Sequence, residues 1–464
     1  MEFLDKSVLP QSLSHMILLK YLLVLTFIIF YTYVGILFGS LSFSLYFRRK
    51  AVKTGNKLYQ KFSKDLIDQI TFNKGLAFAL GMIPLLSAAF CYAQLLHLTN
   101  VNVPEYLLVS LIFLFVAMLL IYTYKYTFHL KDIFKFAGEK KESGNEGDSI
   151  ESEIKSYEVK TSRLHQKSGL YGLILLVIAT YIFTGANELA SDTSRWKEGS
   201  GFFSMLFDIT TIIYYIQFLA TSIAVTSATI LYYFYRPDNP LALKSIEPAS
   251  PSLRSANRGE YYAFVKSFAL KSGLISTISL PAFIALTIFV KPLASLSFGL
   301  FTLTTVALMF LLFLSSMYYF MIKESHLRYR ASVIYIIVIV LAFLIIKDQF
   351  SFDTATKEQT ALLAANFDQY EKKMAEASGT AAPAINGADI YNGRCIACHS
   401  FDHRVVGPPY NQTIPKYVGH KDELVKFIMN PVKKNPGYPA MPNQGLKPAE
   451  ADAVADWLLS HFKK

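Results

Sequence analysis

Long apolar runs dominate the first three quarters of the chain. Runs of about 18 or more apolar residues can cross hydrocarbon about 30 Å thick as helices. They occur over 16–46, 76–98, 105–128, 168–188, 203–235, 268–290, 295–322 and 331–347. The pattern therefore predicts an all-α fold that begins with an eight-helix transmembrane domain over residues 1–347. The first and fifth runs exceed the length of a span, so we expect these helices to tilt or to project from the bilayer.

The pattern becomes polar after residue 347. Residues 353–377 predict a weakly amphipathic polar helix, and residues 378–384 read SGTAAPA, a small-residue stretch typical of linkers. We therefore expect a linker with one helix over 348–385 and a second, smaller domain over 386–464.

Composition and charge support this division. Of the 464 residues, 53% are hydrophobic and only 17% charged, which is too apolar for a soluble globular chain. The net charge of +11 is unevenly placed. The loops after the first, third, fifth and seventh helices carry eight, eight, five and three Lys or Arg, whereas the head and the other loops carry at most two each. The positive-inside rule then places the charged loops in the cytoplasm and both termini outside. The charge indicates topology, not a nucleic-acid partner.

Two of the three cysteines form a motif with the histidine that follows them. Cys395, Cys398 and His399 make a C-x-x-C-H sequence, the arrangement for covalent haem attachment through two thioethers, with the imidazole on the proximal side of the iron. A zinc site would need a second ligand pair, and a thioredoxin-like unit would need strands nearby; the sequence has neither. The motif predicts one haem c and, with the charge pattern, a periplasmic domain of a bacterial cytoplasmic (inner) membrane protein.

Residues 386–464 resemble a class I cytochrome c. Gly387 and Tyr391, four apart before the motif, are similar to the Gly/aromatic pair at which the family's first and last helices cross. Trp457, on the predicted closing helix, matches the aromatic partner of that pair.

The resemblance also implies the groups at the iron. A Gly-Pro-Pro segment is similar to the one whose proline carbonyl holds the proximal imidazole, which assigns that role to Pro408. A Tyr-Pro-Ala-Met-Pro segment before the last helix implies Met441 as the sixth ligand, while Met429 is expected in the core. His403 and His420 are the alternative, bis-histidine, ligands. Methionine ligation raises the potential and suits one-electron transfer among relatively oxidising partners.

The membrane domain has four open hypotheses. His15 and His97 clasp a haem b near the outer face, or a haem near the inner face uses His129 with His165 or His326. In the third hypothesis the helices bind quinol without haem or dock on a larger respiratory complex. In the fourth the histidines are merely interfacial. Ionisable groups at membrane depth are costly and often functional. The candidate proton or quinol groups are Lys20, Glu105, Glu188 and Asp208.

The predicted function is respiratory electron transfer. Electrons pass from a quinol or a membrane complex to a soluble cytochrome or terminal oxidase, which makes the chain a quinol:cytochrome c oxidoreductase or a subunit of one. The alternatives are a non-catalytic, haem-bearing docking subunit of a larger complex and an oxygen-reducing oxidase subunit. Expected partners are lipid, other respiratory subunits, quinol and a redox protein drawn to a basic surface. That surface is predicted at Lys416, Lys421, Lys426, Lys433 and Lys434.

Overall fold

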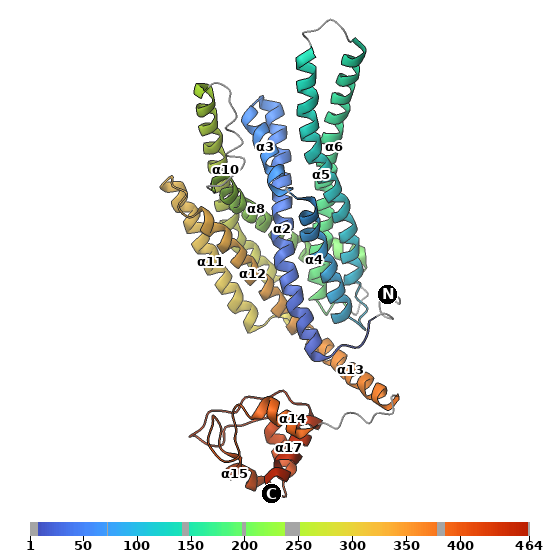
Figure 1. Ribbon diagram of the computed structural model, residues 1–464, viewed down its shortest axis with the longest axis vertical. Coiled ribbons are helices and arrows are strands. Elements are labelled where there is room, and N and C mark those ends of the chain that lie inside the picture. Colours follow the sequence, from blue (N-terminus) through green and yellow to red (C-terminus); the bar gives the residue numbers. More distant parts are fainter. Residues whose placement is uncertain are drawn as a thin grey trace. The chain divides into compact units, whose positions relative to one another are not determined.

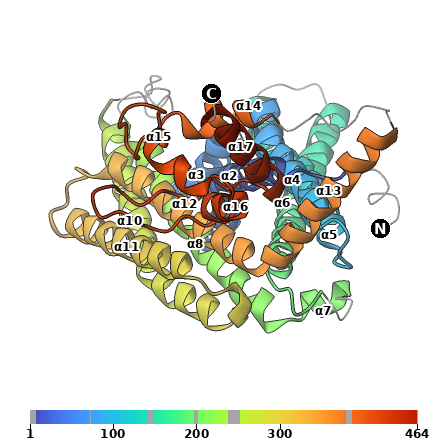
Figure 2. The same ribbon diagram turned by 90° about the horizontal axis from the view of Figure 1, so that it is seen from below.

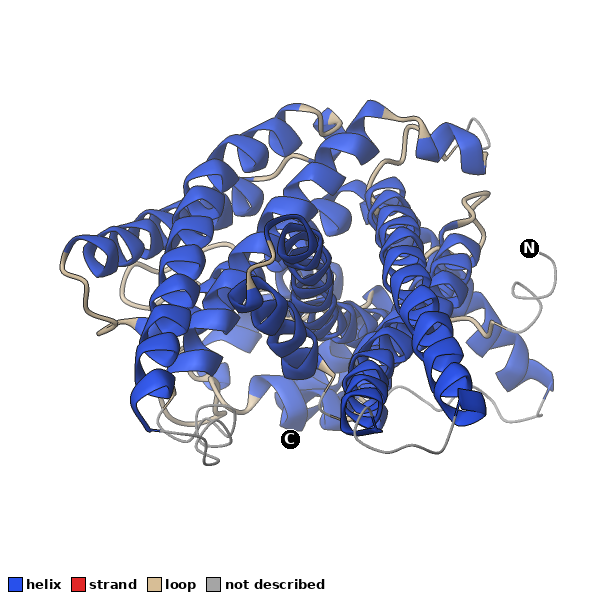
Figure 3. Ribbon diagram, turned by 90° about the horizontal axis from the view of Figure 1, so that it is seen from above, coloured by secondary structure: helices blue, strands red, loops and turns tan. Residues whose placement is uncertain are grey.

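The computed structural model describes residues 8–71, 73–141, 148–196, 201–236, 251–377 and 386–462. These residues form helices joined by turns, with no strand among them (Figure 3). The all-α prediction is confirmed. The chain divides into two compact units, Met1–Phe367 and Asp368–Lys464. The predicted linker stretch 378–384 lies outside the described residues.

The first unit is a multi-pass membrane domain. Within the described residues, eight helices are long and apolar enough to cross a membrane, as the sequence predicted. They are α2 (Leu13–Thr54), α4 (Lys74–Leu95), α5 (Val103–Lys141), α6 (Asp148–Ala190), α8 (Ile209–Tyr235), α10 (Pro251–Phe289), α11 (Phe298–Lys323) and α12 (Arg330–Ala355). The shorter elements of this part are α3 (Lys57–Ile70), α7 (Phe202–Leu206) and η1 (Leu293–Ser295), and α13 (Lys357–Ala377) follows α12.

Several helix boundaries differ from the predicted ones. Helices α5, α6, α10 and α12 continue well beyond the apolar runs, because backbone hydrogen bonding persists into polar sequence that a hydropathy window does not detect. The predicted fifth helix, 203–235, is two helices, since the chain leaves helical geometry at Phe207 and Asp208. Asp208 is the N-cap of α8 with extended φ and ψ of −73° and 135°, a position that aspartate favours.

Helix α2 lies in the middle of the membrane domain. Figures 1 and 2 show α4, α5 and α6 on one side of it and α8, α10, α11 and α12 on the other. It packs against α3, α4, α6, α8 and α12. Two hydrophobic cores result, one centred on α2 with α4, α5 and α6, the other on α8 with α10, α11 and α12. The domain is therefore built as two helix groups that share α2.

Two glycines allow α2 and α8 to approach closely. Gly35 and Gly39, one turn apart on α2, face Ser222 and Thr226 of α8. A Cβ atom on Gly39 would lie 2.2 Å from Thr226 Oγ1, and that hydroxyl donates a hydrogen bond to the Gly35 carbonyl at 3.3 Å. Small residues spaced by four are a common means of packing helices in membranes, where lipid contacts compete with protein contacts.

The second unit is small and helical. Its elements are α14 (Gly387–Ile390), η2 (Tyr391–Cys395), α15 (Tyr410–Thr413), η3 (Ile414–Tyr417), α16 (Lys421–Met429) and α17 (Pro448–Phe462). Helix α14 crosses α17 so tightly that a Cβ on Gly387 would lie 2.3 Å from the Ala453 carbonyl oxygen. One turn later Tyr391 stacks on Trp457 with ring centroids 4.6 Å apart. This is the crossing that the resemblance implied.

Candidate functional site

The second unit contains a cavity that is partly open to solvent. Its lining comes from two stretches of the chain, the motif with the loop after it and the loop that precedes α17. The lining residues are Arg394, Cys395, Cys398, His399, Val406, Gly407, Pro408, Pro439, Ala440, Met441, Pro442 and Gln444. The fold therefore gathers the five haem-site residues expected from sequence around a single space.

The imidazole of His399 is fixed from several sides. Its Nδ1 lies 3.0 Å from the carbonyl oxygen of Pro408. Since a carbonyl only accepts, Nδ1 carries the proton and donates, which leaves the Nε2 lone pair for a metal. The ring stacks on Tyr410 at 4.9 Å and 13°. A Cβ on Gly407 would lie 2.3 Å from His399 Cε1, so only glycine fits beside the ring.

The two cysteines are held by a helical turn. The amides of Cys398 and His399 donate to the Cys395 carbonyl at 3.1 and 2.9 Å. Cys395 is buried and Cys398 half-buried. Burial raises the pKa of the Cys395 thiol, and burial also raises the pKa of the neighbouring Tyr410 hydroxyl far above its ordinary range. Both thiols thus line the cavity that His399 faces.

Two arginines tie the loop that carries Met441 to the motif side of the domain. Arg394 donates to the Gln444 carbonyl at 2.6 Å, and Arg404 donates to the Gly437 carbonyl at 3.1 Å. These bonds bracket Met441 along the chain. This role was not predicted, because no motif pairs either arginine with a carbonyl so far along the chain.

This donor set fits a covalent haem. It provides two thiols, one imidazole nitrogen with its tautomer fixed, and one thioether sulfur around one cavity. Residues 382–458 match the family model described as cytochrome C oxidase, cbb3-type, subunit III. Cytochrome c-551 of Pseudomonas denitrificans is 33% identical over 79 residues, which are 16% of this chain and 95% of that protein. Through its C-terminal domain, this chain belongs to the cytochrome c family.

Further relatives cover the same cytochrome domain. Cytochrome c-552 of Hydrogenobacter thermophilus is 39% identical over 70 residues, 14% of this chain and 70% of that protein. No family model matches the part before residue 382, and no solved structure matches the chain. The domain carries a covalent haem c and has a haem-based electron-transfer role, as the sequence predicted.

The candidate proton groups of the membrane domain lie in different surroundings. Arg195 joins two of them, with its Nη1 at 3.1 Å from Glu188 and 2.9 Å from Asp208. Lys20 instead pairs with Asp353 at 3.1 Å. Glu105 lies in the first turn of α5, and its Oε2 is buried with no hydrogen-bond partner in the described structure. Only Glu188 and Asp208 are brought together.

The histidines proposed for a haem b near the outer face lie at helix ends. His15 is exposed in the first turn of α2, where its backbone amide is capped by the Ser12 hydroxyl at 3.3 Å. His97 follows α4 and is half-buried, and its carbonyl accepts from Gln359 at 2.6 Å. Their role as haem ligands stays a prediction.

At the other end of the bundle, His165 has a structural environment. It is buried between α5 and α6, where its Nδ1 lies 2.9 Å from the Thr127 hydroxyl and its ring stacks on Tyr124 at 4.3 Å. His129 Nε2 lies 3.4 Å from Asp68. In these contacts His165 is a packing and hydrogen-bonding group, and His129 is the partner of a carboxylate.

Sequence reasoning missed an ionic cluster at the end of α12. Asp348 Oδ1 lies 2.7 Å from Lys347 Nζ and 3.4 Å from Lys291 Nζ. The lysine side chains are 0% and 5% exposed. The available signal was the charged pair Lys347 and Asp348 directly after an apolar run, which the hydropathy analysis treated as the end of a helix.

Proposed function

We propose that this chain carries electrons from a quinol or a membrane complex to a soluble cytochrome or terminal oxidase. The observation that carries the proposal is the cavity that His399 and Met441 share with both cysteines of the motif. His399 would hold the haem iron through Nε2, and Met441 would hold it through sulfur. The single haem c supplies one-electron chemistry when bound.

The chain's own residues set the conditions for that transfer. Pro408 holds the His399 tautomer, and Gly407 lets the loop approach the ring. A methionine ligand favours the reduced state and raises the potential. Arg394 and Arg404 hold the methionine loop in place. The arrangement supports acceptance and release of one electron at a relatively high potential.

The proposed location is the bacterial cytoplasmic membrane, with both termini in the periplasm. The distribution of Lys and Arg among the loops supports this orientation. Phosphatase fusions test it: a fusion after Lys464 is expected to be active and a fusion near Lys160 inactive. The opposite pair of results would reverse the map.

A second candidate is a haem-bearing subunit that docks in a larger respiratory complex. The matching family model is described as subunit III of a cbb3-type oxidase, a part of a larger assembly. Purified chain in detergent distinguishes the two candidates. If the membrane domain oxidises quinol itself, duroquinol reduces the haem c of the isolated chain. If the chain only docks, ascorbate reduces that haem and duroquinol does so only in membranes that contain the partner.

A further inference from the structure

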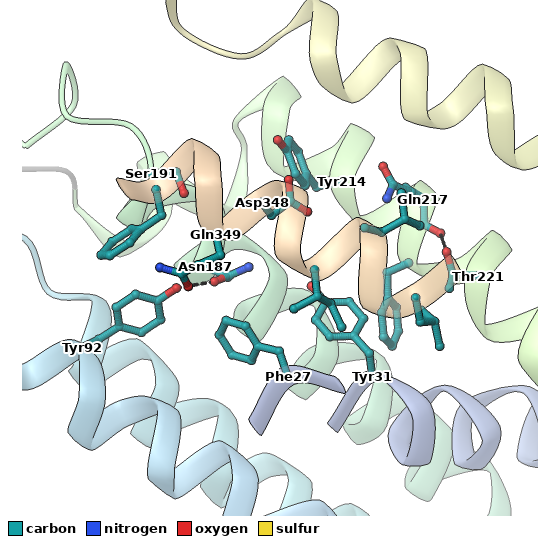
Figure 4. Close-up of a pocket in the computed structure, with 15 residues that line it drawn as sticks. Phe27, Tyr31, Tyr92, Asn187, Ser191, Tyr214, Gln217, Thr221, Asp348 and Gln349 are labelled. Carbon is teal, nitrogen blue, oxygen red and sulfur yellow. Dashed lines mark hydrogen bonds between the residues drawn. The ribbon is translucent and has the colours of Figure 1, made fainter. Parts of the chain in front are cut away.

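The membrane domain contains a cavity beside the C-terminal half of α12. Its walls come from α2, α4, α6, α8 and α12 (Figure 4). Six aromatic side chains line it, Phe27, Tyr31, Tyr92, Tyr214, Phe218 and Phe352. Binding sites for small molecules are typically lined by apolar and aromatic side chains with a few polar groups. Flat aromatic walls suit a planar ring.

Charge is concentrated on one side of this cavity. Asp348 lines it and accepts contacts from Lys347 and Lys291, so one carboxylate faces two ammonium groups. Burial lowers the pKa of Lys291, which also lies 5.2 Å from the Tyr214 ring centroid. Glu188, one of the two carboxylates at Arg195, also acts electrostatically on Lys291, so charges of both signs lie near the cavity. The charged group that lines the cavity is therefore a carboxylate, which can accept a hydrogen bond from a ligand hydroxyl.

Amide side chains provide a second polar side. Asn187 accepts from the Tyr92 hydroxyl at 2.5 Å, which leaves its amide N–H groups as donors. Gln349 donates to Asp353 at 2.9 Å, which leaves its carbonyl oxygen as an acceptor. Figure 4 shows Asn187 and Gln349 side by side next to Tyr92. The cavity thus offers hydrogen bonds at two places with aromatic rings between them.

We propose that this cavity binds the ring of a quinone or quinol. One ring oxygen lies toward Asp348 with its lysines, the other toward Asn187 and Gln349, and the apolar tail leaves into lipid. The inference rests on the proposed function, because it supplies the site at which electrons enter. The site contains none of Lys20, Glu105, Glu188 or Asp208 among its lining residues.

The reaction at the site balances as follows. One quinol loses two hydroxyl protons and two electrons to become a quinone. Asp348 accepts the first proton and passes it to water, and the second proton follows the same way. Each electron reduces one ferric haem c to the ferrous state, so one quinol requires two oxidising equivalents from the cytochrome domain.

Binding and electron entry are measured separately on the full haem-loaded chain in detergent. The binding probe is oxidised decyl-ubiquinone or menadione, followed by the rise in Tm that any ligand of the folded state produces. Electron entry is the rate of haem c reduction by the corresponding quinol. The variants are Asp348→Asn and Gln349→Leu. The matched control is Asp68→Asn, which changes a carboxylate paired with Lys125 and His129 on α5.

We expect the quinone to raise Tm in the wild type and in Asp68→Asn. Both cavity variants should need at least tenfold more quinone for the same rise in Tm. They should also show rates of haem reduction by quinol at least tenfold lower, with unchanged reduction by ascorbate.

Variants that bind quinone and react with quinol like the wild type would overturn the cavity assignment and leave quinol oxidation standing. Quinone binding lost in the variants, without quinol-driven reduction in the wild type, would support the site and overturn electron entry. A Tm rise with inorganic phosphate or anionic lipid vesicles, but not with quinones, would mark an anion site and overturn the proposal. If Asp348→Asn does not fold, Gln349→Leu alone decides.

Discussion

The Nδ1 atom of His399 lies 3.0 Å from the carbonyl oxygen of Pro408, which orients the imidazole toward the cavity that Met441 lines. This single contact links the loop after the motif to the chemistry of the site. Mutation of Pro408 would not remove its backbone carbonyl. The contact with His399 is therefore best perturbed through Gly407, the residue before Pro408.

Gly407→Ala is expected to displace the His399 ring. The new methyl would lie 2.3 Å from Cε1 and 2.7 Å from Nδ1 of that ring, which leaves it no space. Overpacking of this kind typically costs about 1–3 kcal/mol. We expect a lower Tm of the cytochrome domain and a lower haem midpoint potential, measured by redox titration. Gly393→Ala, where a Cβ meets nothing within 4 Å, is the control and should change neither.

Gly39→Leu is expected to separate α2 from α8. A side chain there meets Thr226 at once, and the α2 contacts with both helix groups would have to rearrange. The membrane domain should lose several °C of Tm in detergent, while the c-type absorbance spectrum stays unchanged. Gly259→Leu, at an open position of α10, should cost far less. Equal losses in the two variants would contradict close α2–α8 packing.

Lys426→Glu is expected to slow electron transfer to an acidic acceptor several-fold at low salt, and to weaken the dependence of the rate on ionic strength. Lys421→Gln should have a smaller effect. Its ammonium already lies 2.8 Å from Asp452 and 2.7 Å from Asp456, so its charge is neutralised within the domain. Stopped-flow rates over a salt series provide the measurement. Rates that do not depend on salt would contradict electrostatic steering.

The amphipathic helix α3 predicts a pH dependence of stability. Burial raises the pKa of Asp65 to about 6, although the Tyr261 hydroxyl donates to its carboxylate at 2.5 Å. In the unfolded state Asp65 has its ordinary pKa of 3.8 and loses its proton above that pH. In the folded state it keeps the proton up to about pH 6. The Asp65 contribution to stability therefore increases as pH falls from 7 toward 4, by up to about 3 kcal/mol. The Tm of the wild type relative to Asp65→Asn should rise as pH falls from 7 to 5; a constant difference would contradict this.

A structural feature could be predicted from the sequence when its signal lies within one segment of the chain. The eight spans and the C-x-x-C-H motif were predictable, because apolar length and motif spacing lie within single segments. The pairing of Lys421 with Asp452 and Asp456 was not, and the predicted basic surface is smaller by that charge. Contacts between side chains of separate helices could not be predicted from the sequence.

The membrane domain shows the same limit more strongly. Lys291 lies between α10 and α11 and Asp348 lies within α12, and only the packing of these helices brings them within 3.4 Å. The carboxylates and histidines singled out by their positions at helix ends do not line the large cavity there. The position of a polar residue along its own helix does not indicate which other helix packs against that residue.

The central claim is a single haem c held by His399 and Met441, and the most direct test is the absorbance spectrum of purified chain with Met441 intact and replaced. A pyridine haemochrome assay should give one c-type haem per chain. Met441→Ala should abolish the methionine-to-iron charge-transfer absorbance of the oxidised protein and lower its potential, while Met429→Ala, a change in the domain core, should keep that absorbance. A charge-transfer band that persists in Met441→Ala, or a reduced spectrum without a c-type band, would contradict the account.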